Sequence, residues 1–417
     1  GTGLINVTAA FNYLINVQRT KSIPDILLPV PKRLPFYPIT TLFQGQTLSY
    51  NVTLVSSGTF QATETINNDT YGFIHITNIS SFTDTTLLPV TISIPLNAVL
   101  QKYLINIMIG TNRNGLTVDI PIMFEVKKPK LQILFDEAHN GLVNQVKNIN
   151  DDMNNVQDPW GKSSFLIGEF LYFFNIMIEN NISVTPFQNG FLNNLSYLNK
   201  FDTVILPYPV TKLTDIFTDW WNDTTYFPQS TLTRSVLSFT SDELMTLKNY
   251  VIESHKNLII LTSYPQMHDI PELNKLLGLF NLTYVNETHE QKLDLSSEPY
   301  QNELAKNIHS IDYIGGSLTS SHDGFQGYLW GKLQNSNNYG LAFWHNPKGG
   351  NLFVSGSGFF MENLGLSSIN TDESANNELL LLNIINSTSY INYNPLPFQA
   401  RLSSDRMRPD RFYNSYH

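Results

Sequence analysis

LQILFDE, residues 131–137, is a short apolar run that ends in two acidic residues and follows a boundary at Lys127–Lys130. Such runs are typical of strands that are buried on both faces of a parallel sheet. Three similar runs come later in the chain: ISVTPF at 182–187, TVILPYP at 203–209 and NLIILTS at 257–263. Residues 131–137 are therefore predicted to begin a mainly parallel sheet.

The segments between these runs predict helices. SFLIGEFLYFFNIMIEN (164–180) is long and apolar enough for a buried helix, and SDELMTLKNYVIESH (241–255) offers Ser241 as an N-cap and Glu243 in its first turn. ESANNELLLLNIIN (373–386) is expected to close the domain. Strands that alternate with helices predict a Rossmann-like α/β domain over residues 131–386. Closely spaced runs at 327–333, 340–345 and 351–357 predict an antiparallel extension of its sheet.

Residues 41–127 follow a different pattern, with short β-type runs separated by turn residues. The runs are LSYNVTLV (48–55), FIHITNI (73–79), LLPVTISIPL (87–96), YLINIMIG (103–110) and LTVDIPIMFEV (116–126). Their spacing predicts an all-β domain, a β-sandwich of immunoglobulin or fibronectin type. Five prolines in residues 20–40 predict an extended linker before it, and residues 387–417 are expected to form an extended C-terminal tail.

Composition narrows the class of protein. Charged residues are 14% of the chain, well below the roughly 25% usual for soluble proteins, and Asn, Ser and Thr supply the polarity instead. The chain has no cysteine and a net charge of −10, which exclude disulfides and thiolate metal sites and argue against a nucleic-acid partner. No run of apolar residues is long enough for a transmembrane segment. We expect an extracellular or cell-surface protein whose signal peptide lay upstream.

The chain carries sequons for N-glycosylation, although a composition this rich in Asn, Ser and Thr also produces such motifs by chance. They begin at Asn6, Asn51, Asn68, Asn78, Asn181, Asn194, Asn222, Asn281, Asn286 and Asn386. We predict that several of them carry glycans.

Polar residues follow the first predicted strand of the α/β domain, at the edge where such sheets bind ligands. They are Asp136, Glu137 and His139, and Asp158 comes before the next helix. Carboxylates and an imidazole could together hold a divalent metal or another ligand. The alternative is that Asp136 and His139 hold the loop through hydrogen bonds.

No catalytic centre is predicted. A glutamine amidotransferase would place a nucleophile after a strand such as 257–263, but Thr262, Ser263 and Tyr264 stand there without a cysteine or flanking glycines. His268 and Asp269 lie close in sequence but do not make a triad with Ser263. KGGNLFVSGSGFF (348–360) lacks the phosphate-loop pattern and predicts a strand and a turn where backbones approach closely. We predict no cofactor.

GTGLINVTAAFNYL, residues 1–14, carries an apolar stripe at helical spacing and resembles the end of the catalytic domain of subtilisin-like serine proteases (subtilases). Gly1, Gly3, Ile5, Asn6 and Ala10 match that pattern, and Val7 replaces its alanine. Further matches to the site-1 protease branch and its archaeal relatives are Phe135-Asp136, His139-Asn140, Asp158-Pro159-Trp160 and GGNLFVSGSGFF. The resemblance implies that residues 1–19 end a catalytic domain and that residues 131–386 adopt a glutamine-amidotransferase-like fold without its nucleophile.

The subtilase Asp, His and Ser motifs would lie upstream, so the resemblance gives this chain no catalytic residue. It implies a C-terminal accessory region whose partner is the upstream protease domain or fragment. The alternative is a structural cell-surface glycoprotein of a surface layer or filament, which would self-assemble or bind other surface proteins. A third possibility is a metal-dependent hydrolase that uses Asp136, Glu137 and His139.

Overall fold

The computed structural model describes most of residues 27–387. The exceptions are residues 31, 36–39, 57–58, 78, 80, 83–84, 113–116, 140–169, 188–189, 211–237, 297–303, 306, 321–326, 346–349 and 367–370. The predicted subtilase-end helix (1–19), the C-terminal tail, Asp158, Asn6, Asn78 and Asn222 lie outside the described residues. The chain divides into two compact units at Lys128 and Pro129, within the predicted boundary.

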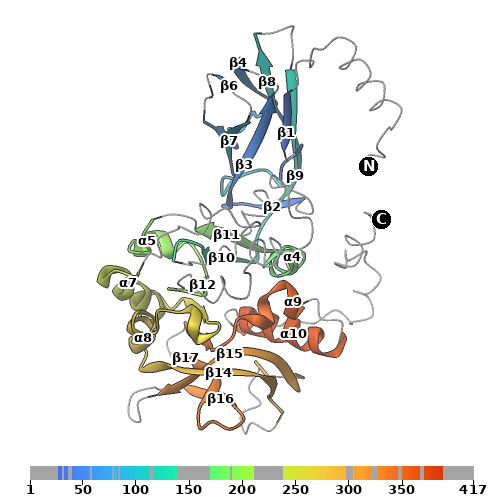
Figure 1. Ribbon diagram of the computed structural model, residues 1–417. Coiled ribbons are helices and arrows are strands. Elements are labelled where there is room, and N and C mark those ends of the chain that lie inside the picture. The colour runs from blue at the N-terminus through green and yellow to red at the C-terminus, as the bar shows by residue number, and fades with distance from the viewer. Residues whose placement is uncertain are drawn as a thin grey trace, which may run out of the picture. The chain divides into compact units, whose positions relative to one another are not determined.

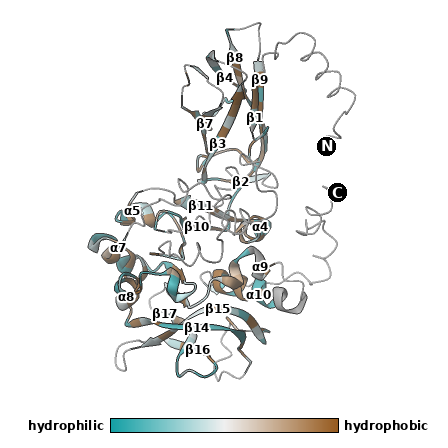
Figure 2. Ribbon diagram, in the orientation of Figure 1, coloured by the Kyte–Doolittle hydropathy of each residue, from teal (hydrophilic) through white to brown (hydrophobic). Residues whose placement is uncertain are grey.

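The first unit consists of two sheets (Figure 1). One has the order β1 (Leu27–Val30), β3 (Thr47–Ser56), β7 (Thr85–Ser93), β5 (Ile74–Ile76), and the other has the order β2 (Thr41–Phe43), β9 (Thr117–Lys127), β8 (Lys102–Thr111), β4 (Phe60–Asn67), β6 (Ser81–Phe82). Alternate side chains of these strands are buried, as period-two patterning requires. Apolar stretches along these strands are visible in Figure 2. The phenyl rings of Phe73 and Phe124, whose centroids lie 6.1 Å apart, connect the two sheets.

Part of the predicted linker at 20–40 belongs to this sandwich. Leu27–Val30 forms β1 and pairs antiparallel with β3, and Leu34 pairs with Ile122 of β9. Proline is tolerated in β1 because an edge strand needs hydrogen bonds on one side only. Residues 27–30 and Leu34 therefore belong to the sandwich and not to a connector.

The second unit contains one sheet with a parallel and an antiparallel part. The parallel part has the order β11 (Ile182–Phe187), β10 (Leu131–Asp136), β12 (Thr203–Pro207), β13 (Asn257–Leu261), β18 (Asn351–Ser355). The sheet continues antiparallel with β17 (Tyr339–His345), β15 (Ser310–Ser320) and β14 (Leu282–Asp294), and β16 (Tyr328–Lys332) pairs with β17. The predicted combination of an α/β part with an all-β part is confirmed at this coarse level.

Helices accompany the strands of the second unit. They are α4 (Leu171–Glu179), α5 (Leu195–Leu198), α7 (Ser241–Ile252), α8 (Ile270–Gly278), α9 (Asn363–Leu366) and α10 (Thr371–Ser387), with 3-10 turns η2 (Pro265–Met267) and η3 (Phe359–Met361). Two predictions need correction. β18, predicted within the antiparallel extension, runs parallel to β13 and antiparallel to β17, so it joins the two parts. The N-cap of α7 is Thr240 rather than Ser241.

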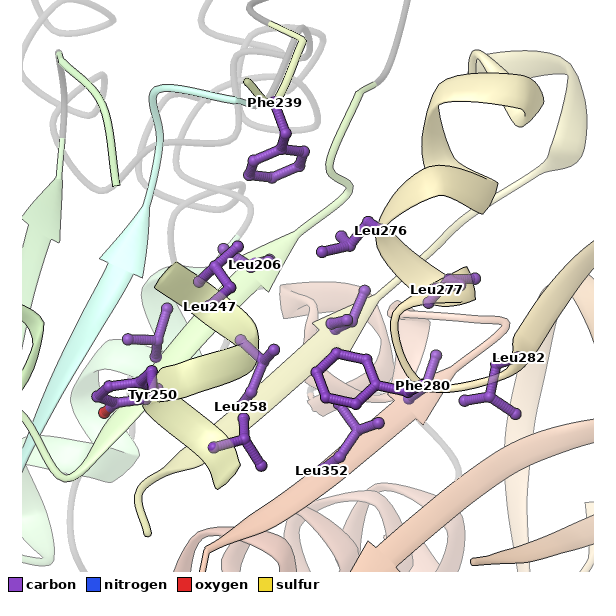
Figure 3. Close-up of a cluster of buried hydrophobic side chains, with 14 of the residues drawn as sticks. Leu206, Phe239, Leu247, Tyr250, Leu258, Leu276, Leu277, Phe280, Leu282 and Leu352 are labelled. Atoms are coloured by element: carbon purple, nitrogen blue, oxygen red, sulfur yellow. The ribbon is translucent and has the colours of Figure 1, made fainter. Parts of the chain in front are cut away.

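The core that supports the site lies between α7, α8 and the sheet. Leu247 and Tyr250 of α7 pack toward Leu258 of β13, and Leu276 and Leu277 of α8 lie in the same buried cluster (Figure 3). Each fully buried leucine contributes about 1.5–3 kcal/mol. A helix of 12 residues is marginal alone, so this packing is what holds α7 in place. None of the helices within the described ranges is long and apolar enough to cross a membrane.

Candidate functional site

The carboxyl ends of β10 and β12 lie side by side where the strand order of the parallel sheet reverses. The chain passes from β10 to β11 on one side of β10 and returns to β12 on the other side. In open α/β sheets this switch point forms the crevice in which ligands bind. The residues that follow Asp136 and Pro207 are therefore the first candidates for a functional site.

An ion triad is buried at this point. Nδ1 of His139 lies 2.9 Å from Oδ2 of Asp136, and its Nε2 lies 2.9 Å from Oε1 of Glu243. All three side chains are buried. Carboxylate oxygens at this distance from both ring nitrogens favour the doubly protonated, cationic form of the ring. We call Asp136, His139 and Glu243 the switch-point triad.

The charges of the triad stabilise one another. Burial alone would lower the pKa of His139, but the charges and hydrogen bonds of the two carboxylates outweigh burial and raise that pKa to about 9. Burial alone would raise the pKa of Glu243, but the hydrogen bonds that it accepts, first the one from His139, lower that pKa to about 2. His139 and Glu243 therefore remain charged at neutral and mildly acidic pH.

Glu243 also connects the triad to the start of α7. Its Oε2 accepts a hydrogen bond of 2.8 Å from the backbone N–H of Thr240, and Oγ1 of Thr240 accepts one of 3.3 Å from the N–H of Glu243, which makes a capping box. Its Oε1 accepts a further bond of 2.7 Å from the N–H of Leu192. One carboxylate thus fixes the helix, the segment before α5 and the imidazole ring.

Phe239 covers one face of His139. The two rings are stacked, with centroids 4.3 Å apart and an interplanar angle of 10°. Phe239 belongs to the buried apolar cluster (Figure 3). An aromatic face against an imidazolium is favourable and keeps water from the ring. The triad is therefore a closed element of the core.

The turn after β12 is strained and firmly held. Tyr208 and Val210 have φ values of 49° and 56°, a region in which a β-branched residue such as valine is rarely found. The N–H of Val210 donates to the carbonyl of His139 at 2.9 Å, and the N–H of Tyr208 donates to that of Leu261 at 2.8 Å. Within the described part of the chain, the buried hydroxyl of Tyr208 has no hydrogen-bond partner.

His268 holds the same turn through hydrogen bonds, but its ring is neutral, unlike that of His139. Its Nδ1–H donates to the carbonyl of Pro209 at 3.1 Å, and its Nε2 accepts from the backbone N–H of Ser263 at 2.9 Å. Burial lowers its pKa to about 4, so the ring is neutral. The Ser263 hydroxyl donates instead to Sδ of Met267 at 3.6 Å. Ser263 and His268 therefore do not form a nucleophile–base pair.

The structure brings together three of the four sequence candidates. Asp136 and His139 interact directly, Glu137 is buried next to Asp136, and Asp158 lies outside the described residues. Both His139 nitrogens lie 2.9 Å from a carboxylate oxygen, of Asp136 on one side and of Glu243 on the other. Over the described ranges, no group of three or more His, Cys, Asp or Glu side chains is arranged to hold a metal. Asp136 and His139 make the contact that the hydrogen-bonding alternative requires, and the metal or ligand site stays a prediction.

Sequence reasoning missed the partnership of Glu243 with His139. It placed Glu243 correctly in the first turn of α7, and the Thr240–Glu243 spacing is a capping-box signal. Nothing in the sequence connects this helix start with the loop after β10, because only the strand order brings them together.

The sequons differ in accessibility. Asn68, Asn194, Asn281 and Asn286 are exposed, whereas Asn51, Asn181 and Asn386 are half-buried. Oδ1 of Asn194 caps α5 by accepting from the N–H of Tyr197 at 3.0 Å, which leaves its nitrogen for a glycan. The four exposed asparagines are the accessible acceptors among the described sequons.

Comparison with known proteins identifies no family. No family model and no curated protein matches the chain. Among solved structures, the chain is similar to SSP-19, an MSP-domain protein-like family member of Caenorhabditis elegans, with 10% identity and a TM-score of 0.15 over 21% of this chain and 94% of that one. It is also similar to a family 123 glycoside hydrolase from Clostridium perfringens, with 10% identity and a TM-score of 0.21 over 59% of this chain and 45% of that one. Similarities this low carry no functional inference.

Proposed function

We propose that the chain is a non-catalytic accessory region of a secreted subtilase-like serine protease, which scaffolds the protease or docks it to a surface. The resemblance of residues 1–14 to the end of a subtilase catalytic domain supports the association with a protease. We assign the sandwich to the fibronectin or immunoglobulin type. The α/β unit is proposed to derive from a glutamine-amidotransferase-like fold that has lost its nucleophile.

The observation that carries this function is the switch-point triad. A general base needs a ring nitrogen with a free lone pair within reach of the substrate. Both nitrogens of His139 lie at ion-pair distance from buried carboxylates, and both nitrogens of His268 are bonded to backbone groups. Side chains that could serve chemistry at this edge are instead used to hold loops together, which supports a structural role for the unit.

The test begins with native material. Peptide mass spectrometry that reads upstream of Gly1 should find peptides with the subtilase Asp, His and Ser motifs in equal abundance to peptides of this chain. Absence of such peptides would contradict the association with a protease.

A second measurement addresses the role of the α/β unit. In the complete precursor, His139→Asn should lower the melting temperature and leave the peptidase activity per folded molecule unchanged. Its control is His255→Asn, because His255 is exposed and has a positive φ that asparagine tolerates. A loss of activity in His139→Asn without a loss of stability would assign catalysis to this unit.

The exposed sequons favour a second candidate, a structural glycoprotein of the cell surface. Glycans at Asn68, Asn194, Asn281 and Asn286 would cover both units. Enzymatic deglycosylation followed by peptide mapping should then show mass loss at these four positions in native material. Unmodified asparagine at all four would remove the observation that supports this candidate.

A further inference from the structure

The first unit carries a surface of exposed apolar side chains on the loop between β7 and β8 and on the adjoining strands. Leu96, Val99 and Leu100 lie on the loop, and all three are exposed. Leu104 of β8 and Met123 of β9 are exposed as well and lie directly opposite each other in register. We call these five residues the loop surface.

The loop backbone is held in a fixed conformation while its apolar side chains face outward. The N–H of Ala98 donates to the carbonyl of Pro95 at 3.1 Å, and Nε2 of Gln44 donates to the carbonyl of Ala98 at 2.7 Å. The hydroxyl of Tyr103 donates to the carbonyl of Val99 at 2.8 Å. Because hydrogen bonds fix the backbone between these exposed side chains, little conformational freedom would be lost on binding.

An aromatic residue stands beside the loop. The ring of Tyr71, which is exposed, stacks on Phe73 at 5.3 Å and meets the edge of Tyr103 at 5.6 Å. Its own turn is also fixed, because Asp69 accepts hydrogen bonds of 2.8 Å from the N–H groups of Phe73 and Ile74. Tyr71 is therefore presented next to the loop on a rigid support.

Lysines border the apolar residues. Lys102 lies on the same face of β8 as Leu104, two residues away, and Lys127 lies on the same face of β9 as Met123. Lys128 follows and is exposed. Glu125, on the same face, lies 3.6 Å from Lys127 and directly opposite Lys102 in register. The three lysines outnumber this glutamate, so the border of the loop surface keeps a positive charge although the chain has a net charge of −10.

We propose that the loop surface docks on an anionic lipid bilayer. Leu96, Val99 and Leu100 enter the boundary between headgroups and acyl chains, and Tyr71 lies at the headgroup level, where tyrosine is enriched. Lys102, Lys127 and Lys128 face the lipid phosphates, each worth about 1 kcal/mol near an anionic surface. This inference does not depend on an association with a protease.

Vesicle flotation of the full chain tests this surface. The chain should bind vesicles of phosphatidylcholine mixed with phosphatidylglycerol, bind phosphatidylcholine alone more weakly, and dissociate as salt is raised. The double variant Leu96→Asp/Leu100→Asp should reduce binding by about tenfold or more. Lys102→Gln/Lys128→Gln should weaken binding to the anionic vesicles and reduce its salt dependence.

Leu87→Asp is the matched control. Leu87 is 57% exposed, close to the 55% of Leu100, but it belongs to β7 in the other sheet. This variant should bind like the unchanged chain, and the circular dichroism and melting of each variant establish that it folds. Absence of vesicle binding, or equal loss in the control and the double variant, would overturn the inference. Self-association that disappears in the double variant would also overturn it, since copies of the chain would then occupy the surface.

Discussion

The backbone N–H of Val210 donates a hydrogen bond of 2.9 Å to the carbonyl of His139. This bond joins the strained turn after β12 to the loop that carries the switch-point triad. Val210 has a φ of 56°, where a β-branched residue persists only if its surroundings hold it there. The triad and the turn are therefore expected to lose their structure together.

Substitution of His139 tests how much the switch-point triad contributes to the stability of the second unit. His139→Asn removes the cation and leaves the carboxylates of Asp136 and Glu243 buried without it. Breaking a buried ion pair in this way costs about 3–5 kcal/mol. Urea unfolding at mildly acidic pH should show that loss. The exposed control His255→Asn should stay within about 0.5 kcal/mol, and an equal loss in both variants would contradict a special role for the triad.

The triad should also give the second unit a characteristic pH dependence. The pKa of His139 is about 9 when folded and 6.5 ordinarily, so its contribution is complete below pH 6.5 and is lost as pH rises through 9. The pKa of Glu243 is about 2 when folded and 4.5 ordinarily, so its contribution is complete above pH 4.5 and is lost as pH falls through 2.

Between pH 4.5 and 6.5 the stability contributions of His139 and Glu243 are both complete. The difference in unfolding free energy between the unchanged chain and His139→Asn should be largest there. Taking this difference cancels groups common to both proteins, including His268, whose lowered pKa destabilises the fold as pH falls below 6.5. A difference that stays constant from pH 2 to pH 9 would show that His139 does not titrate as the ion pairs require.

The hydroxyl of Tyr208 is expected to lower the free energy of unfolding. It is buried and has no partner within the described part of the chain, so Tyr208→Phe should raise the unfolding free energy by about 1 kcal/mol. Tyr250→Phe is the opposite case, because it removes a hydrogen bond of 3.1 Å to the carbonyl of Phe201 and should cost about 1 kcal/mol. If Tyr208→Phe is destabilising instead, the hydroxyl has a partner, and the switch point would deserve a search for a bound ligand.

Glycines at the end of β18 allow a close approach of backbones. A Cβ atom on Gly356 would lie 2.5 Å from the carbonyl oxygen of Gly316, whereas one on Gly278 at the end of α8 would meet nothing within 4 Å. Gly356→Ala should therefore lower the melting temperature. Gly278→Ala should raise stability by about 0.5–1 kcal/mol because alanine is the better helix former. A thermal scan of both variants checks the contrast, and equal effects would contradict it.

Periodicity predicted the parallel core well because its strands are apolar on both faces. Residues 182–187 form β11 with the predicted bounds, and β10, β12 and β13 begin where their apolar runs begin. The same signal failed for β14. Its sequence, LTYVNETHEQKLD, is polar at most positions because one face of this edge strand is exposed.

The site was predictable in part. The residues after the first strand, Asp136, Glu137 and His139, were found from the rule that strand ends form binding edges. The interaction of His139 with Glu243 could not be predicted in this way. Glu243 is brought near His139 by the order of β10 and β12 and by the packing of α7. Residue types near a strand end can be predicted from sequence, whereas the partners of those residues depend on tertiary packing.

The parallel pairing of β2 with β9 has a mechanical consequence. β2 lies near the start of the sandwich and β9 is its last strand, and they are joined by bonds such as Gln44 N–H to the Lys127 carbonyl, 3.0 Å. When the two ends of this unit are pulled apart, parallel strands slide along each other and all their bonds carry force together. Forced unfolding follows the rate of barrier crossing, so single-molecule extension should show a high-force event for the sandwich. A module that resists tension along the chain would suit a protein that tethers its neighbours.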